Sequence, residues 1–199
     1  GVETTFCGDE FPFIVQNRTM AGQFSAHVMT SIISGFIISF PYILYEFWKF
    51  ISPGLLEKEK AKSRGFIFVS SMLFFIGVLF GYYIISPLSI NFLGTYQVSS
   101  QVLNEIDLGS FISLVRSSAI ASGIIFELPI IIYFLSKAGV VTPESLVKYR
   151  KYALVLVLVL AAIITPPDVA SQIIVAIPIV VLYQVSIFIS RIVVKNQAK

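Results

Sequence analysis

Residues 111–137 read FISLVRSSAIASGIIFELPIIIYFLSK, a run of mostly apolar side chains with a glutamate halfway along it. The run is long enough to cross the roughly 30 Å hydrocarbon core of a bilayer, which takes about 20 helical residues. Glu127 would then lie near the bilayer midplane, where inserting an ionised side chain costs roughly 3 kcal/mol. A carboxyl group in that position indicates either a functional site or a polar contact between helices.

The composition of the whole chain is that of a membrane protein. Of its 199 residues, 56% are hydrophobic and 13% charged, whereas soluble domains carry about 25% charged residues. The mean hydropathy is +0.88. Five stretches are apolar enough to be spans, at 23–50, 66–88, 111–138, 150–165 and 169–190. The sequence predicts an all-α integral membrane protein with five transmembrane helices. The last two are short enough to thin the bilayer locally or stop short of one face.

Positive charge is segregated along the chain. Residues 49–64, 137–151 and those after 190 hold all but two, Arg18 and Arg116, of the 14 Lys and Arg residues. Because Lys and Arg collect in cytoplasmic loops, the first span is expected to run from outside to inside.

This orientation divides the chain into three parts. Residues 1–22 are predicted to form an external loop, 23–191 the transmembrane bundle and 192–199 a cytoplasmic tail. An external N-terminus without a preceding span is unusual, so we expect the given sequence to begin inside a longer chain.

Three spans contain a proline followed about one turn later by an aromatic residue, at Pro41, Pro129 and Pro178. Proline removes one backbone donor and clashes with the preceding turn, so each is a candidate kink. Bent helices side by side would form a concave face able to hold another helix. Membrane helices in general also carry more proline than soluble ones, so the prolines alone do not establish such a face.

Small residues recur four positions apart in three spans, a spacing that lets helix backbones approach closely. They are Ser31, Gly35 and Ser39 in the first span, Gly77 and Gly81 in the second, and Ala119 and Gly123 in the third. We expect these faces to form contacts within the bundle.

Enzyme motifs are missing from the sequence, which has no G-x-S-x-G elbow, H-E-x-x-H motif or P-loop. His27 is the only histidine, and one imidazole without a placed partner performs no recognisable acid or base chemistry. Cys7 is the only cysteine, too few for a disulfide or for the usual zinc ligands. We therefore expect no catalytic residue, no cofactor and no metal. The segregated charge points to membrane orientation and not to nucleic acid.

Two roles are open for Glu127: a hydrogen bond to a neighbouring helix, or one step of a proton path. A proton path needs a chain of titratable groups. Arg116 lies eleven residues away, about 16 Å along a helix, too far to pair directly. No second carboxylate lies at comparable depth, so a polar helix contact is favoured. The alternative is a small-solute or proton transporter that uses Glu127.

Residues 52–60, SPGLLEKEK, begin with a turn and continue as a short charged helix on the cytoplasmic side. Such a run is usually a solvated face. A carboxylate held at the membrane surface can also bind a guanidinium through paired, charge-assisted hydrogen bonds. Arginine recognition is therefore a second interpretation of this segment.

Four motifs together resemble the TatC family, the multispanning subunit of the twin-arginine protein translocase. They are FPY at 40–42, FISPGL at 50–55 with Glu59 following, FELP at 126–129, and TPPDVASQ at 165–172 followed by Ile177 and Pro178. Their order and spacing agree with the family from about residue 20 to 191. One motif would mean little, but four on the correct sides of five segments are specific.

The resemblance implies a glove-shaped helix bundle that serves as receptor and core scaffold of the translocase. The family exports folded cargo proteins whose signal peptides carry paired arginines, using the proton-motive force. It works in an oligomeric complex with single-span subunits of the TatA and TatB type. The expected location is the bacterial cytoplasmic (inner) membrane, as a multi-pass protein, with a thylakoid less expected.

The resemblance also implies roles for individual residues. Glu59 would contact the arginine pair, with Phe50 and Pro53 shaping that cytoplasmic site. Glu127 would line the concave face, where signal-peptide or partner helices lie.

The same resemblance implies that Gln172 and the last two spans form a groove for a partner's transmembrane helix, with Asp168 in the outer turn between those spans. The family has six spans, and here the first is missing. The cytoplasmic segment that precedes this span in the family, and that supplies a second acidic contact to the arginine pair, is missing as well.

Overall fold

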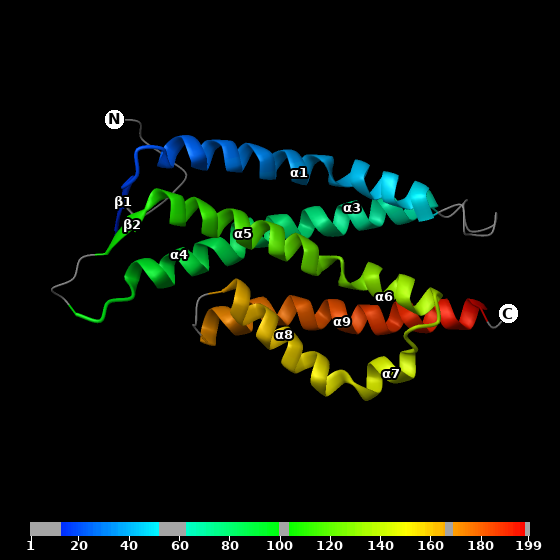
Figure 1. Cartoon of the computed structure of the whole chain (residues 1–199). Helices are drawn as coiled ribbons and strands as arrows, with labels where there is room; N and C mark the ends of the chain where they lie inside the picture. The colour runs from blue at the N-terminus through cyan, green and yellow to red at the C-terminus, as the bar shows by residue number, and fades with distance from the viewer. Residues whose placement is uncertain (1–12, 52–62, 100–103, 166–168, 198–199) are drawn as a thin grey trace.

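The computed structural model describes residues 13–51, 63–99, 104–165 and 169–197, which form a bundle of long helices (Figure 1). The first part of the chain comprises β1 (Ile14–Gln16), α1 (Gly22–Ile51), α3 (Ser63–Phe80), the π-helical turn η2 (Gly81–Ile85) and α4 (Ser86–Thr95). The second part comprises β2 (Glu105–Asp107), α5 (Leu108–Phe126), α6 (Leu128–Lys137), α7 (Pro143–Lys148), α8 (Arg150–Ile164) and α9 (Val169–Gln197).

The predicted class, an all-α membrane protein, is confirmed. Within the described ranges, four helical stretches are long and apolar enough to cross a membrane: Gly22–Phe50, Ile67–Thr95, Leu108–Lys137 and Ser171–Asn196. The fourth predicted span, 150–165, corresponds to α8, which has 15 residues and therefore rises only about 22 Å.

The second span is longer than predicted, because the helix continues through η2 and α4 to Thr95. Pro87 stands in the first turn of α4 and has no N–H to donate to the preceding turn. The wider π turn accommodates this interruption, and the hydroxyl of Ser86 donates to the Gly81 carbonyl at 2.8 Å. The last helix is also longer than predicted and ends at Gln197.

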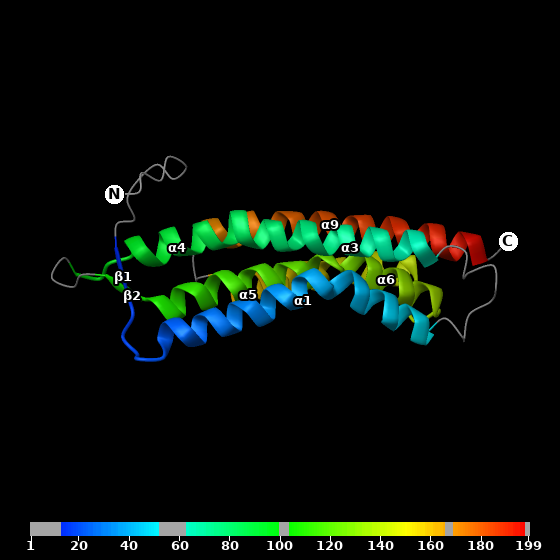
Figure 2. The ribbon, with the colours of Figure 1, turned by 90° about the horizontal axis from the view of Figure 1, so that it is seen from above.

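The third span changes its neighbours halfway along. Its first half, α5, packs against α1, α3 and η2, whereas its second half, α6, packs against α9. Figures 1 and 2 show this arrangement, with α5 beside α1 and α3, and α6 beside α9. The junction between the two halves is Glu127, which ends α5 and precedes α6.

Glycines bring α5 into close contact with α3 and with the π turn η2 that follows it, as predicted for the second and third spans. A Cβ added to Gly77 would lie 2.8 Å from the Cα of Gly123, and one added to Gly81 would lie 2.7 Å from the Cα of Ala119. These helices can approach so closely only because glycine has no side chain.

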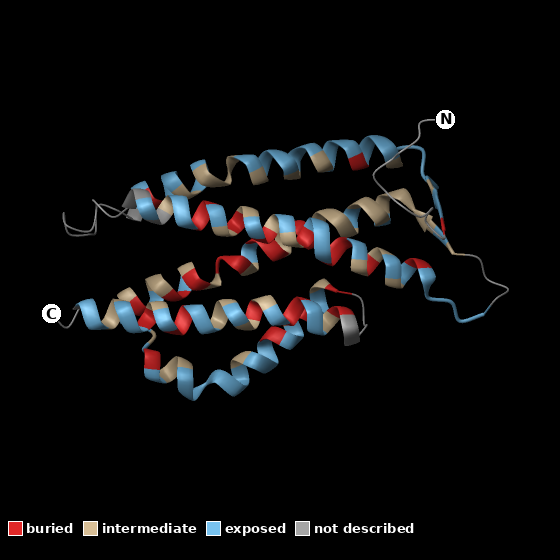
Figure 3. Cartoon of the chain, turned by 180° about the vertical axis from the view of Figure 1, so that it is seen from behind, coloured by how far each residue is buried: buried red, intermediate tan, exposed pale blue. Residues whose placement is uncertain are grey.

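The same prediction is wrong for α1. A Cβ added to Gly35 would meet no atom of the described residues within 4 Å. The hydroxyls of Ser31 and Ser39 donate to carbonyls of their own helix, those of His27 and Gly35. Figure 3 shows exposed residues along most of α1. At its inner end Trp48 is nevertheless buried and lies beside the ring of Phe134 in α6, at 5.9 Å between centroids.

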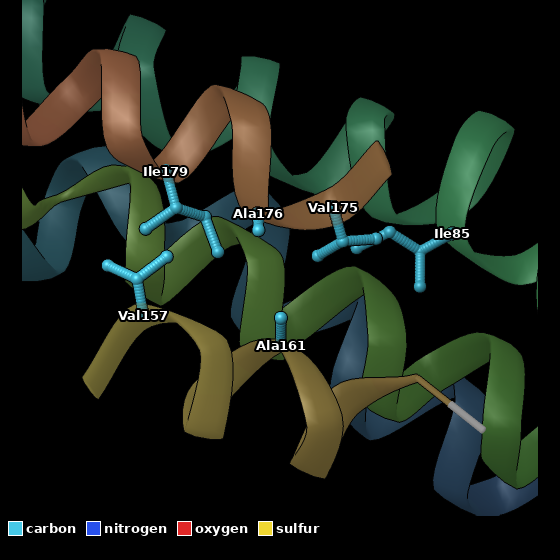
Figure 4. Packing of buried hydrophobic residues seen from close by; sticks show 6 residues of the cluster. All are labelled: Ile85, Val157, Ala161, Val175, Ala176 and Ile179. Carbon is cyan, nitrogen blue, oxygen red and sulfur yellow. The ribbon is translucent and has the colours of Figure 1, made fainter. Parts of the chain in front are cut away.

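A compact apolar cluster joins α8 and α9 to the middle of the bundle (Figure 4). Its buried members are Ile85, Val157, Ala161, Val175, Ala176 and Ile179. Ile125 and Leu128, which flank the α5–α6 junction, pack against this cluster. The junction is therefore anchored to the apolar core on both sides of Glu127.

A small parallel sheet ties together the end of the bundle where α1 begins. Strands β1 and β2 pair with Ile14 opposite Glu105, and Arg18 forms an exposed ion pair with Glu105 at 3.0 Å. The end of α8 and the start of α9 stop well short of this sheet (Figure 1). The sequence analysis did not predict the strands.

Candidate functional site

Glu127 occupies the break between α5 and α6, and the local sequence explains the break. Pro129 stands in the first turn of α6, where its missing N–H cannot continue the hydrogen-bond ladder of α5. The carbonyl of Glu127 accepts hydrogen bonds from Ile130 and Ile131 and so begins the new helix. The carboxyl group is thus carried on a fixed junction and not on a loop.

The carboxyl group of Glu127 is buried, with 8% of the residue exposed. Ser70 of α3 donates a hydrogen bond from its hydroxyl to Oε2 at 2.6 Å. Oε1 is also buried and makes no hydrogen bond with any residue that the structure describes. This geometry is the polar helix contact that the sequence favoured, although the partner is a hydroxyl that the sequence analysis did not single out.

Arg116 does not approach Glu127. Its Nη1 lies 3.5 Å from the carbonyl oxygen of Ala26 in α1, near the upper limit for a hydrogen bond. Arg116 and Glu127 therefore act at different levels of the bundle, as their eleven-residue separation predicts.

Gln172 lies in the first turn of α9 and makes a contact within the chain. Its amide nitrogen donates to the carbonyl of Leu158 in α8 at 3.0 Å. The side chain thereby holds the α8–α9 hairpin together. Asp168 lies outside the described residues.

The cytoplasmic candidate residues are described only in part. Phe50 is 84% exposed in the last turn of α1. Pro53 and Glu59 lie outside the residues that the structure describes.

The other two candidate kink residues stand inside helices that continue past them. Pro41 lies within α1, which changes direction along its length in Figure 2. Pro178 lies within α9, which remains helical from Val169 to Gln197.

Two further polar contacts fix the second half of the bundle, and the sequence analysis missed both. The hydroxyl of Ser136 in α6 donates to that of Ser190 in α9 at 2.7 Å, and both residues are buried. The hydroxyl of Tyr183 in α9 donates to the carbonyl of Leu146 in α7 at 2.8 Å. Serines inside apolar runs were the available signal, because a buried hydroxyl needs a partner.

Groups that could hold a metal are missing from the described parts of the chain, where no three His, Cys, Asp or Glu side chains gather. Two pairs of buried side chains instead join one helix to another, Ser70 with Glu127 and Ser136 with Ser190. These contacts position the helices that carry them.

Known proteins match both the sequence and the fold. Residues 10–178 match the profile of the family described as Sec-independent protein translocase protein (TatC). The protein of that name from Blattabacterium sp. subsp. Periplaneta americana is 49% identical over 183 residues, covering 92% of this chain and 69% of that protein. The one from Aquifex aeolicus is 42% identical over 173 residues, covering 85% and 71%.

A solved structure agrees with the arrangement of helices. The crystal structure titled twin arginine translocase receptor TatC superposes with a TM-score of 0.74 at 38% identity, covering 92% of this chain and 80% of that one. The resemblance found in the sequence is confirmed. This chain belongs to the TatC family, whose members are non-enzymatic, multi-pass membrane components of a protein translocase.

Proposed function

We propose that this chain is the receptor and core scaffold of a twin-arginine translocase in a bacterial cytoplasmic membrane. It binds twin-arginine signal peptides of folded cargo proteins and single-span partner subunits of the TatA and TatB type. Export is driven by the proton-motive force. The observation that carries this proposal is the match, over 92% of the chain, to a structure titled as a twin arginine translocase receptor.

The signal-peptide site is proposed at the cytoplasmic end of α1. Glu59 pairs with a guanidinium of the signal peptide, because a carboxylate can accept two parallel hydrogen bonds from arginine but not from lysine. Phe50 and Pro53 shape the site, and the high exposure of Phe50 supports its availability for contact.

Site-specific photocrosslinking tests this recognition. A photoreactive residue at position 59 of the chain, in membranes with its partner subunits, is expected to capture a twin-arginine signal peptide far more than its twin-lysine counterpart. Glu144, the acidic residue in the first turn of α7, provides the matched control position, where the two peptides should be captured alike. Equal capture of both peptides at position 59 would overturn the recognition proposal.

Glu127 is proposed to serve the concave face on which signal-peptide or partner helices lie. Its position at the break between α5 and α6 supports this role, because the hydrogen bond from Ser70 holds the carboxyl in one place there. A transporter would instead show solute or proton flux into liposomes containing the chain alone, abolished by Glu127→Gln. Such flux would replace the scaffold proposal.

The groove for a partner helix is proposed along α8 and the start of α9, with Gln172 and Asp168 at its outer end. The large exposed apolar side chains of α8, which include Val155, Leu156 and Ile163, support this assignment. Such a surface on a membrane helix suits packing with another helix or with lipid.

Copurification of single-span subunits tests the groove. Gln172→Leu is expected to lower the yield of tagged partner subunits, whereas Gln184→Leu, which removes an exposed amide from the same helix, should leave it unchanged. Because Gln172 also ties α8 to α9, the unfolding temperature of both variants is measured. An unchanged yield with Gln172→Leu would contradict the groove.

A further inference from the structure

An open pocket of about 440 Å³ lies between the start of α1 and the first half of α5, away from the candidate site. Among the described residues that line it, Arg116 is the charged one, and the hydroxyl residues Thr19, Ser25 and Ser113 lie around it. The Asp107 carboxylate borders the lining residue Gly109, and it already accepts a hydrogen bond from the backbone N–H of Ser110 at 3.1 Å. The lining itself therefore offers a cation and three hydroxyls. That set of groups is complementary to an anion.

Arg116 has donors to spare. A guanidinium carries five N–H donors, yet the one hydrogen bond that Arg116 makes to a described residue is the long one to the Ala26 carbonyl. Its Nε is buried without a partner, and Arg116 forms no ion pair with any carboxylate that the structure describes. The other arginine at this end, Arg18, is already paired with Glu105.

The hydroxyls that line the pocket are also available to form hydrogen bonds. The side chains of Thr19, Ser25 and Ser113 make no hydrogen bond to another described residue. A ligand with several acceptor oxygens could therefore be bound without breaking a contact already present in the protein.

The depth of the pocket identifies the source of such a ligand. The apolar helix Gly22–Phe50 has 29 residues, so it is about 43 Å long against a hydrocarbon core of about 30 Å. A centred helix leaves about four residues at each end in the headgroup layers. Ala26, the contact of Arg116, lies at that boundary, where the phosphate groups of phospholipids begin.

The surface below the pocket suits an acyl chain. Met29 and Ile32 follow Ser25 by four and seven positions and so share its face of α1. They are 51% and 60% exposed. A lipid whose phosphate occupies the pocket can therefore lay one acyl chain along this apolar stripe.

We propose that this pocket binds the phosphate group of a phospholipid in the leaflet at the N-terminal end of α1, the outer leaflet in the orientation predicted from the charge distribution. Arg116 donates two parallel N–H bonds to the phosphate, and the hydroxyls of Ser25 and Ser113 complete the site. The bound lipid balances the charge of Arg116 and fills the space between α1 and α5.

Native mass spectrometry of the full chain in mild detergent, titrated with palmitoyl-oleoyl phosphatidylglycerol, tests the proposal. Arg116→Gln loses a charge-assisted hydrogen bond. Its dissociation constant for the most tightly bound lipid is therefore expected to be at least about tenfold higher than that of the unmodified chain. Arg116→Lys keeps the charge and should retain part of the affinity. Arg18→Gln removes a cation from the same end outside the pocket and should bind as the unmodified chain does.

Two outcomes would overturn the proposal. One is equal lipid binding by the unmodified chain and Arg116→Gln, with both shown to be folded by their unfolding temperatures. The other is displacement of the lipid by an equal concentration of inorganic phosphate, which would assign the pocket to a free anion. Lipid retention in excess phosphate, lost only with Arg116→Gln, supports the lipid site.

Discussion

The contact between Ser70 and Glu127 shows how a carboxyl group is accommodated inside this bundle. One oxygen accepts a hydrogen bond at 2.6 Å, and the whole residue is 8% exposed. Polar contacts between membrane helices contribute on average about 0.6 kcal/mol and at most about 2 kcal/mol. The bond is therefore a modest stabiliser whose main effect is to hold the carboxyl in one place.

Ser70→Ala tests this contact. The substitution leaves both carboxyl oxygens of Glu127 without a hydrogen bond from the described residues, so we expect it to lower the free energy of unfolding by about 1 kcal/mol. Thermal unfolding of the purified chain in detergent measures the change.

Ser71→Ala is the matched control, because Ser71 is the next residue, is also buried, and its hydroxyl has no hydrogen-bond partner in the described part of the chain. Its loss should leave stability nearly unchanged. In a double-mutant cycle, the Ser70→Ala effect should shrink when Glu127 is already Leu. Equal effects of the two serine substitutions would contradict the assignment.

At this scale the sequence identified Glu127 but not its partner. A carboxyl in an apolar run is visible from the cost of inserting it. Ser70 lies 57 residues away, and the sequence does not fix how far one helix slides or rotates against another. The partner is moreover a hydroxyl, which does not stand out in an apolar run as a titratable side chain does.

At the scale of the helices, the α3–α5 interface depends on backbone contact. The Cβ position of Gly81 lies 2.7 Å from the Cα of Ala119, and Gly77 meets Gly123 in the same way. Backbone atoms cannot rotate away as a flexible side chain can, so an added methyl group must separate the helices.

Gly81→Ala is therefore expected to destabilise the chain by about 1–3 kcal/mol through overpacking. Gly35→Ala is the control, because nothing lies within 4 Å of its added methyl group. Alanine is favoured over glycine inside a helix, so this control should be neutral or stabilising by up to about 1 kcal/mol. Thermal unfolding compares the two variants. Equal stability of both would show that the second span does not pack against α5 through Gly81.

The hydroxyl of Tyr183 provides a second test at this scale, since it joins α9 to the short helix α7. Without it, we expect α7 to open more often, with amide hydrogen exchange over Pro143–Lys148 rising about fivefold for a lost bond worth about 1 kcal/mol. Hydrogen exchange with mass spectrometry measures Tyr183→Phe against Tyr152→Phe, which alters an exposed ring. Unchanged exchange with Tyr183→Phe would contradict the contact.

The positions of the helices were largely predictable from the sequence. The predictions that were wrong have physical causes. Apolar length located the spans, and the spacing of small residues identified the α3–α5 face. The same spacing gave a wrong prediction for α1, because it shows that a backbone can be approached but not that a neighbour is present. The π turn before Pro87 was not predicted, because only Pro41, Pro129 and Pro178 were interpreted as kinks.

At the scale of the whole molecule, α8 is shorter than the other spans. Arg150 and Lys151 hold the start of α8 at the side rich in positive charge. Its 15 residues rise about 22 Å and end about 8 Å short of the far side of a hydrocarbon core of typical thickness. The bilayer beside the α8–α9 hairpin must therefore become thinner, or the end of α8 must remain within the hydrocarbon core.

A spin label measures this mismatch. In a chain with Cys7→Ser, a label at position 163, which is 75% exposed in the last turn of α8, should report a deeper position as the acyl chains of the bilayer lengthen. A label at Met20, ahead of α1 and fully exposed, should remain accessible to water-soluble quenchers. A depth at position 163 that does not change with acyl-chain length would contradict the short-hairpin interpretation.

Composition predicted the membrane class because it reflects the bilayer as a solvent, which acts on every residue. Two features could not be predicted from the sequence: the change of neighbouring helices at Glu127 and the pairing of β1 with β2. Both depend on contacts between residues distant in the sequence, such as Ile14 with Glu105, for which no local pattern exists.

The order of the helices along the chain has a consequence for biosynthesis. Ser70 leaves the ribosome 57 residues before Glu127, roughly 3 to 11 s earlier at ordinary rates of synthesis. The hydroxyl is thus already in the membrane when the carboxyl arrives, and α5 can be received by a helix that precedes it. For α6 the order is reversed, because Ser136 is synthesised before its hydrogen-bond partner Ser190. Emergence of Glu127 thus completes the first half of the bundle, while the second half stays open until synthesis is nearly finished.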